Sequence, residues 1–296
     1  MGDTRTEAEL PQLAIVPTQS LVLHEKHDAQ RSAPLVARLR GEGTLKNPPI
    51  VAPIEGEGRY VVLDGTNRAE AIAALGYPHI VVQVVDYDDP ALILDAWFHL
   101  VSGVPCDDFF YALHTIDGLR IKPSDLLHAR AEVARHAALA YVIVPIPCGS
   151  VPPTPNLAHT QGDVHLVYAD GDLYQQAAFL NQMVTLYDGR GRIHRVNTDH
   201  LDQLLPYYED VAVLVVFPRY QPSEIVELAR QGARLPPGVT RHVIPHRALR
   251  INFPLNILAD DRPIEDKNAW LQEWLRSKLA NKQIRYYQES TFLFDE

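Results

Sequence analysis

Residues 61–68, Val-Val-Leu-Asp-Gly-Thr-Asn-Arg, contain the residue types that hold an anion. Their apolar start predicts a buried strand that turns at Gly65 directly into a helix. The first backbone N–H groups of a helix lie at its positive end without helical partners, so a phosphate binds there readily. Gly65 allows close approach of the backbone, Thr66 and Asn67 offer side-chain donors, and Arg68 supplies a two-pronged charged donor. The spacing predicts a phosphate-binding turn.

Asp64 precedes this turn and is a candidate magnesium ligand. Magnesium is usually held by one or two carboxylates together with phosphate oxygens. The alternative is an ordinary helix start, in which Asp64 or Thr66 caps the helix and Arg68 is solvated. The residues alone leave these two interpretations open.

Glu25 lies in a polar segment between an apolar run and the first expected helix. A carboxylate in such a loop can orient a hydroxyl group and accept its proton during group transfer. Most lone glutamates, however, are solvated surface charges, and His24, Lys26 and His27 beside it are equally polar.

A second polar group follows the Pro-Pro-Gly turn at residues 236–238. Arg241 can bind a carboxylate or a phosphate through two parallel N–H bonds, and Thr240 and His242 add donors. The same residues would also suit the start of a strand with Arg241 in water. Trp97 is a further candidate, either beside a substrate or in the core.

Strands and helices alternate along the chain. In the first third we expect strands at 13–16, 21–23, 50–53, 60–63 and 80–85, and helices at 31–40 and 69–75. Beyond it we expect helices at 107–116, 124–137, 173–187, 223–231 and 265–279, strands at 141–146, 164–168, 211–217 and 242–245, and a proline-rich loop at 151–155. The pattern predicts a mixed α/β fold, with one unit over residues 1–105 and a larger part over 106–296.

The composition is that of an ordinary globular chain. The 296 residues are 46% hydrophobic and 22% charged, and 27 Lys and Arg against 37 Asp and Glu give a net charge of −10. An acidic chain lacks the basic footprint of sequence-independent nucleic-acid binding, so we expect no nucleic-acid partner. Two cysteines, no apolar secretory segment and no long apolar run predict a cytoplasmic protein without a membrane partner.

Residues 23–76 resemble the ParB/sulfiredoxin-like superfamily. The resemblance rests on Leu-His-Glu at 23–25, on Gly-x-Leu-x-Asn-Pro-Pro-Ile-Val at 43–51, and on Leu-Asp-Gly-Thr-Asn-Arg at 63–68. Within the superfamily the chain is most similar to the free serine kinases, including those that make phosphoserine for siderophore precursors. Residues 237–245 resemble the substrate-binding segment of the same kinases, so the resemblance covers most of the chain.

This resemblance implies a specific reaction. Phosphoryl transfer from ADP or ATP to free L-serine would give O-phospho-L-serine, a precursor of cysteine or of siderophores. It implies Glu25 as the base and residues 64–68 as the holder of phosphates and magnesium, with Asp64 both a catalytic residue and the metal ligand. Trp97, Thr240, Arg241 and His242 would hold serine and the transferred phosphate, and the site would lie in a cleft between the two parts.

Other branches of the superfamily fit less well. Sulfiredoxins carry a cysteine in this turn, whereas Thr66 and Asn67 stand here. ParB proteins carry an arginine-rich turn followed by a helix-turn-helix module. The alternative function is a ParB-like regulator that binds CTP and acts on a partner or on DNA. The archaeal kinases have a histidine pair where Thr66 and Asn67 stand, which leaves the donor open between ADP, ATP and CTP.

Overall fold

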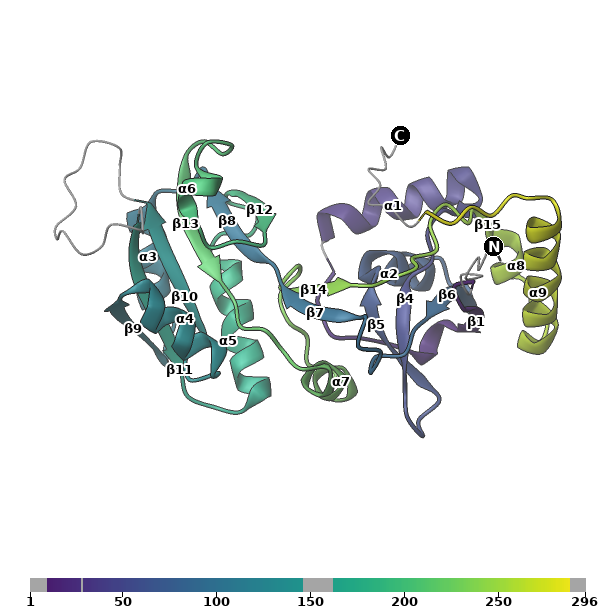
Figure 1. Cartoon of the computed structure of the whole chain (residues 1–296), viewed down its shortest axis with the longest axis horizontal. Helices are drawn as coiled ribbons and strands as arrows, with labels where there is room; N and C mark the ends of the chain where they lie inside the picture. The colour runs from purple at the N-terminus through teal and green to yellow at the C-terminus, as the bar shows by residue number, and fades with distance from the viewer. Residues whose placement is uncertain (1–9, 28, 146–161, 288–296) are drawn as a thin grey trace, which may run out of the picture. The chain divides into compact units, whose positions relative to one another are not determined.

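The computed structural model describes residues 10–27, 29–145 and 162–287 (Figure 1). The expected loop at 151–155 lies outside these residues. In the described part of the chain, no helix combines the length and the apolar character needed to cross a membrane.

The chain divides into two compact units. The first contains the described residues of 10–21, 29–86 and 245–287, and the second contains 22–27 and 87–244. The sequence analysis placed one boundary after residue 105, whereas the structure assigns the C-terminal segment to the first unit. The reason is helix α9 (Ile264–Ala280), which packs on strand β1 (Leu13–Pro17). There the Asn268 side chain accepts from the N–H of Ile15 and donates to its carbonyl, at 2.9 and 2.8 Å.

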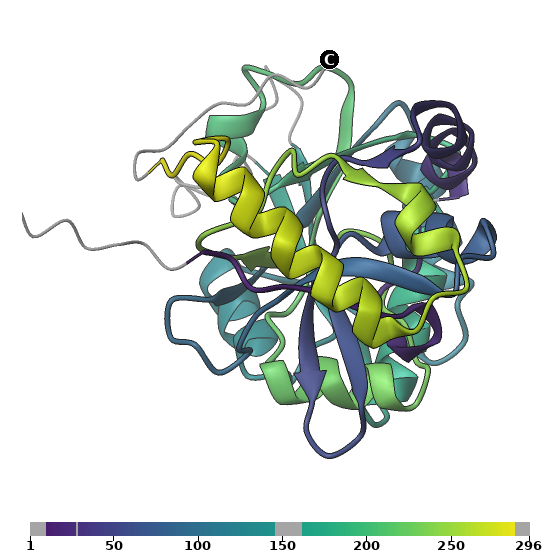
Figure 2. The same cartoon turned by 90° about the vertical axis from the view of Figure 1, so that its right-hand side faces the viewer.

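The first unit is built on a mixed sheet. Within this unit the strand order is β1-β6-β4-β5, with β6 at His79–Val84, β4 at Ile50–Ile54 and β5 at Arg59–Asp64. Strand β2 (Leu21–Leu23) begins at Leu21, the last residue of this unit's first segment. β4 and β6 are parallel, and β1 and β5 are antiparallel to their neighbours β6 and β4. The remaining elements are 3-10 helix η1 (Thr18–Ser20), helices α1 (Ala29–Glu42), α2 (Thr66–Ala74) and α8 (Leu255–Ala259), and the pair β3 (Thr44–Leu45) and β15 (Phe253–Pro254). Figure 2 shows α9 in yellow running across this unit.

The second unit contains an antiparallel six-stranded sheet. Its order is β12-β8-β13-β10-β11-β9, with bounds Arg192–Val196, Phe98–Ser102, Val211–Val216, Ala140–Pro145, Gly162–Ala169 and Leu119–Ser124. A separate ribbon pairs β7 (Ile93–Ala96) with β14 (Thr240–Val243). The helices are α3 (Cys106–His114), α4 (Leu126–Ala134), α5 (Leu173–Thr185), α6 (Leu201–Leu204) and α7 (Pro222–Arg230).

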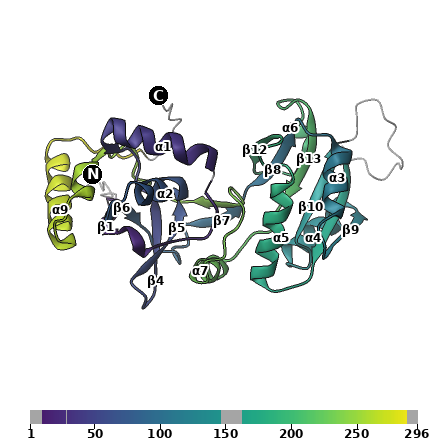
Figure 3. The same cartoon turned by 180° about the vertical axis from the view of Figure 1, so that it is seen from behind.

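Both faces of this sheet are covered. On one face, α4 and α6 contribute Ala129, Val133 and Leu201 to a core with alternate residues of the strands. On the other face, Phe110 of α3 lies against His165 of β11, with ring centroids 4.8 Å apart. Figure 3 shows α5 running alongside the strands. Burial on both faces explains the continuous apolar runs of the central strands.

The predicted mixed α/β fold class is confirmed. Strands β9 and β12 were not predicted, because both are sheet edges with polar sequences and carry no apolar run. β9 contains Pro123, which is tolerated at an edge because one side of an edge strand needs no ladder donor. β7 and β8 were also missed, since only Trp97 separates them.

Candidate functional site

The predicted phosphate turn forms where β5 ends at Asp64 and α2 begins at Thr66. Gly65 caps the helix with a left-handed backbone, φ 94°. A Cβ atom there would lie 2.8 Å from Nη2 of Arg68 and 3.0 Å from Cα of Pro49. Both the conformation and the close approach therefore require glycine.

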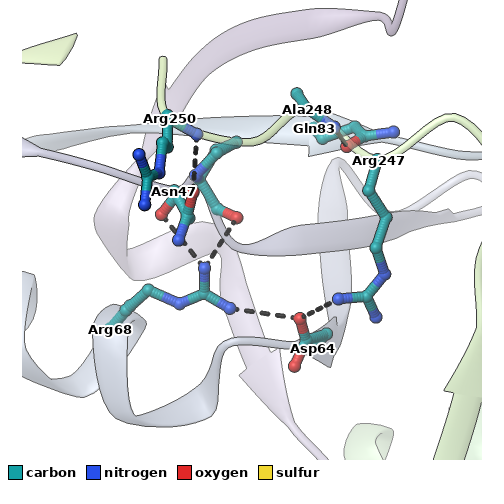
Figure 4. Close-up of polar contacts among 8 residues, drawn as sticks. Asn47, Asp64, Arg68, Gln83, Arg247, Ala248 and Arg250 are labelled. Atoms are coloured by element: carbon teal, nitrogen blue, oxygen red, sulfur yellow. Dashed lines mark hydrogen bonds and ion pairs between the residues drawn. The ribbon is translucent and has the colours of Figure 1, made fainter. Parts of the chain in front are cut away.

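Asp64 lies between two arginines (Figure 4). Its Oδ2 is 3.1 Å from Nη2 of Arg68 and 3.0 Å from Nη1 of Arg247. Burial opposes ionisation of this carboxyl, but the two guanidinium groups outweigh burial and lower its pKa below the usual value. The first unit thus places two guanidinium groups on one carboxylate oxygen beside the turn.

The guanidinium of Arg68 is fixed by the backbone as well. Its Nη1 donates to the carbonyls of Asn47 and Pro48, at 3.2 and 3.4 Å. These residues belong to the Asn-Pro-Pro run that carried part of the resemblance. The run therefore sets the orientation of the arginine, because backbone acceptors hold it in one plane.

Two side-chain amides hold the segment that carries Arg247 and Arg250. The Gln83 amide donates to the carbonyl of His246. It also accepts from the N–H of Ala248, and Asn47 Oδ1 accepts from the N–H of Arg250 at 2.7 Å (Figure 4). The backbone is left-handed at His246, Arg250 and Asn252. Such conformations persist where surrounding contacts enforce them, and they are frequent at functional sites.

A cavity of about 270 Å³ opens beside these residues, within the first unit. Its lining includes four cations, Arg38, Lys46, Arg68 and Arg250, against one carboxylate, Glu42. The other lining residues are Leu35, Leu39, Thr44, Leu45, Asn47 and Asn252. A polar cavity with this charge suits a phosphorylated small molecule. No local sequence pattern connects α1 or Arg250 with the turn, because they meet only in the folded unit.

Asp64, the predicted magnesium ligand, has one carboxylate oxygen without a guanidinium contact from the part of the chain that the structure describes. Both guanidinium contacts of Asp64 fall on Oδ2, so Oδ1 is the atom that suits a metal ion. In the described residues, no group of three or more His, Cys, Asp or Glu side chains is arranged to hold a metal. One carboxylate fits magnesium when substrate phosphates complete the coordination.

In the second unit, Glu25 is held by the segment 238–240. Oε2 accepts from the N–H of Gly238 at 3.0 Å, and Oε1 accepts from the N–H of Thr240 at 2.7 Å. The Thr240 hydroxyl also donates to Oε1. The main chain reinforces this contact, since Leu235 N–H donates to the carbonyl of His24 and Lys26 N–H donates to the carbonyl of Leu235. Three donors thus fix the carboxylate in one orientation.

Two histidines and a tyrosine surround this carboxylate within the same unit. His24 Nε2 lies 2.9 Å from the Thr240 hydroxyl oxygen, and His242 Nε2 lies 2.8 Å from the Tyr87 hydroxyl. The two imidazole rings pack edge to face at 5.5 Å. Burial raises the pKa of Tyr87, and the charge of Glu25 adds to the effect, so this phenol keeps its proton.

Arg241 is positioned by the β7–β14 ribbon. It pairs across the ribbon with Asp95, whose Oδ2 is 3.6 Å from Nη1, and its guanidinium lies 4.7 Å from the centroid of the Trp97 ring. Arg219 binds the other oxygen of Asp95 at 2.6 Å. The second unit thus repeats the arrangement of one aspartate shared by two arginines.

The structure divides the predicted site residues into two groups. Asp64, Gly65, Thr66, Asn67 and Arg68 lie together in the first unit, with Thr66 and Asn67 opening α2. Glu25, Trp97, Thr240, Arg241 and His242 lie in the second unit. The hydroxyl of Thr240, predicted to hold the substrate, donates to Glu25 in this structure. Tyr87 and Asp95 were not predicted as site residues, because their contacts with His242 and Arg241 depend on the tertiary fold.

The amino-acid sequence is similar to those of two proteins named as L-serine kinases. No family model matches the sequence. A protein of Staphylothermus marinus named ATP-dependent L-serine kinase is 25% identical over 251 residues, which covers 82% of this chain and 90% of that protein. A protein of Staphylococcus aureus named ATP-dependent L-serine kinase SbnI is 25% identical over 288 residues, covering 96% and 97%.

The solved structures that are similar to this chain also include serine kinases. A free serine kinase in complex with AMP matches with a TM-score of 0.68 and 16% identity, over 84% of this chain and 95% of that one. This chain has the fold of the free serine kinases. C-terminally truncated SbnI from Staphylococcus aureus shares this serine-kinase fold, with a TM-score of 0.65 and 22% identity over 92% and 97% of the two chains. The fold predicted from residues 23–76 and 237–245 is therefore confirmed.

Proposed function

We propose that this protein is a phosphotransferase that moves the terminal phosphoryl group of ATP or ADP to the hydroxyl of free L-serine, giving O-phospho-L-serine. The observation that carries the proposal is the Glu25 carboxylate, held by donors from Gly238 and Thr240 in the same unit as Arg241. The named L-serine kinases that match 82% and 96% of the chain support it.

Arg241 binds the carboxylate of serine in this proposal. Its guanidinium lies over the Trp97 ring and beside Asp95, so its plane is fixed while its other N–H donors remain for a ligand. A planar fork matches a carboxylate through two parallel bonds. This contact selects a free amino acid, since a residue within a peptide lacks that carboxylate.

Glu25 accepts the proton of the serine hydroxyl. Oε2 accepts from Gly238 N–H and has a second lone pair, which suits a serine hydroxyl. As the proton passes to Glu25, the serine oxygen forms a bond to the terminal phosphorus, and the bond from phosphorus to the bridging oxygen breaks. ADP leaves when ATP is the donor, and AMP leaves when ADP is the donor.

The first unit holds the donor in this proposal. Arg68 and Arg247, together with Arg38, Lys46 and Arg250 around the cavity, neutralise the polyphosphate. The N–H groups at the start of α2 face the negative charge that collects on the leaving phosphate. Magnesium on Oδ1 of Asp64 would supply further neutralisation of the phosphate oxygens when bound.

The test is a donor-by-acceptor panel with the purified full chain. ATP, ADP and CTP are each combined with magnesium and L-serine, L-threonine or L-homoserine, and products are identified by phosphorus NMR and mass spectrometry. We expect O-phospho-L-serine from ATP or ADP. Nucleotide binding without phosphoserine from any donor would overturn the proposal, and CTP turnover to CDP alone would favour the regulator.

A further inference from the structure

His99 is a buried histidine that the proposed reaction does not use. It lies on β8 of the second unit, and 1% of its surface is exposed. Its Nε2 is 3.1 Å from the carbonyl oxygen of Gly238, and its Nδ1 is 2.9 Å from the hydroxyl of Tyr187. A carbonyl oxygen can only accept, so Nε2 carries the proton and Nδ1 accepts from Tyr187. The two contacts fix one tautomer and one ring orientation.

The imidazole is neutral at neutral pH. Burial lowers the pKa of His99 to about 4, although the Gly238 carbonyl acts in the opposite direction. Tyr187 is fully buried, and burial raises the pKa of its phenol, so its hydroxyl keeps the proton that it donates. Both members of the pair therefore keep their donor and acceptor roles across the working pH range.

Residue Gly238 links this pair to Glu25 through the two peptide groups that flank its Cα. Its N–H donates to Oε2 of Glu25, and its carbonyl accepts from His99. The residue has φ 73°, and a Cβ atom there would lie 2.0 Å from Nε of Arg195. A glycine backbone is mobile unless hydrogen bonds hold it, so the His99 bond restrains the Gly238 carbonyl, next to the bond from Trp97 N–H to the carbonyl of Val239.

We propose that His99, supported by Tyr187, is a positioning residue that fixes the 238–240 segment and through it the Glu25 carboxylate. This inference rests on the proposed function, in which Glu25 is the base. His99 is buried and is not among the residues proposed to hold serine or nucleotide. It acts on the proton-transfer step because a carboxylate displaced by a fraction of an ångström loses its alignment with the serine hydroxyl.

The competing explanation is a core histidine that serves packing alone. His99 packs edge to face on Phe217, with ring centroids 4.9 Å apart. A packing role predicts a loss of stability that is independent of Glu25. A positioning role predicts a loss of turnover that disappears once Glu25 no longer acts as a base.

The test measures phosphoserine formation in two backgrounds. His99→Phe keeps a ring but removes the donor to Gly238, and His99→Gln keeps an N–H donor at the same reach. We expect His99→Phe to lower kcat by about tenfold or more with the nucleotide KM within about twofold, and His99→Gln to recover most of the loss. In the Glu25→Gln background, assayed over hours at high enzyme concentration, His99→Phe should change the residual rate by less than about twofold.

His165→Phe is the matched control, because His165 lies in the same sheet and contacts Phe110 instead of the 238–240 segment. Its kcat should equal that of the unmodified chain. Should His99→Phe not fold, Tyr187→Phe keeps the ring and removes only the hydroxyl, and a drop in kcat of about threefold that vanishes in the Glu25→Gln background supports the same inference.

Equal losses in both backgrounds, or a kcat within about twofold of the unmodified chain for His99→Phe, would overturn the inference. Failure of the proposed function is distinguishable. In that case the unmodified chain makes no phosphoserine, or Glu25→Gln alone leaves kcat unchanged.

Discussion

The N–H and the hydroxyl of Thr240 both donate to the same oxygen of Glu25, although the two residues are 215 positions apart in the sequence. The hydroxyl in turn lies 2.9 Å from Nε2 of His24. Because the hydroxyl gives its proton to the carboxylate, it accepts from the imidazole. Hydrogen bonds therefore run from His24 to Thr240 and from Thr240 to Glu25, the predicted base.

Glu25→Gln should abolish most turnover while nucleotide binding persists. The carboxamide has nearly the same shape but cannot accept the serine proton, so kcat should fall by about 10² to 10⁴. The cavity and Arg68 belong to the first unit, so the rise in melting temperature with saturating ATP or ADP should be unchanged. Steady-state kinetics and thermal shift measure the two effects, and equal loss of both would contradict a base role.

Asp95→Asn should weaken serine binding selectively. Loss of the negative charge removes the ion pair that orients Arg241, and the serine KM should rise by about tenfold. The nucleotide KM should stay within about twofold, since no donor contact is changed. Arg219→Ala is the control, because it leaves Asp95 with Arg241. A larger rise in the nucleotide KM than in the serine KM would refute this role.

Arg68→Lys should weaken donor binding and lower stability together. An ammonium cannot reach Asp64 and the carbonyls of Asn47 and Pro48 at once, so partly buried acceptors lose donors, at a total cost of about 1–3 kcal/mol. We expect a fall in melting temperature of about 4 °C or more and a nucleotide KM about tenfold higher. Arg59 begins β5 and forms an exposed ion pair with Glu57, so Arg59→Lys should change neither the melting temperature nor the nucleotide KM. Calorimetry and donor titration make the comparison, and an unaltered nucleotide KM in Arg68→Lys would count against its donor role.

Arg38→Ala and Arg40→Ala form a matched pair on α1. Arg38 lines the cavity and Arg40 does not, although both side chains are exposed. Removal of a cavity cation should raise the nucleotide dissociation constant about three- to tenfold, equivalent to about 1 kcal/mol, with no change in melting temperature. Isothermal titration calorimetry gives the constants. Equal effects of the two substitutions would mean that the cavity does not hold the donor.

His99 should make the stability of the protein fall in mild acid. Its pKa is about 4 in the folded chain against 6.5 ordinarily, so between these values the unfolded chain binds a proton that the folded chain does not. The free energy of unfolding should therefore drop by about 3 kcal/mol as pH falls from above 6.5 to 4. His99→Gln should lack this drop, and exposed His114→Gln should keep it. Urea unfolding between pH 4.5 and 7.5 tests it, and parallel curves for the unmodified chain and His99→Gln would disprove it.

The sequence by itself determined the local parts of this protein. Around Gly65, an apolar run predicts the strand, the glycine predicts the turn, and the helical spacing of apolar residues predicts the helix. Each of these features acts over only a few residues. The mixed α/β class followed in the same way, and the family motifs identified the serine-kinase fold. Edge strands such as β9 escaped prediction because sheet pairing, not their own composition, makes them strands.

Only the tertiary structure decided which distant residues share a partner. Arg247 reaches Asp64, Arg241 faces Asp95, and His99 reaches the carbonyl of Gly238 because sheet register and the return of the C-terminal segment bring them together. These contacts span more than 100 residues of sequence, and no local periodicity encodes them. The amino-acid sequence determines which side chains are charged and which residues can form a turn. Which charged groups pair with one another depends on how whole helices and strands pack.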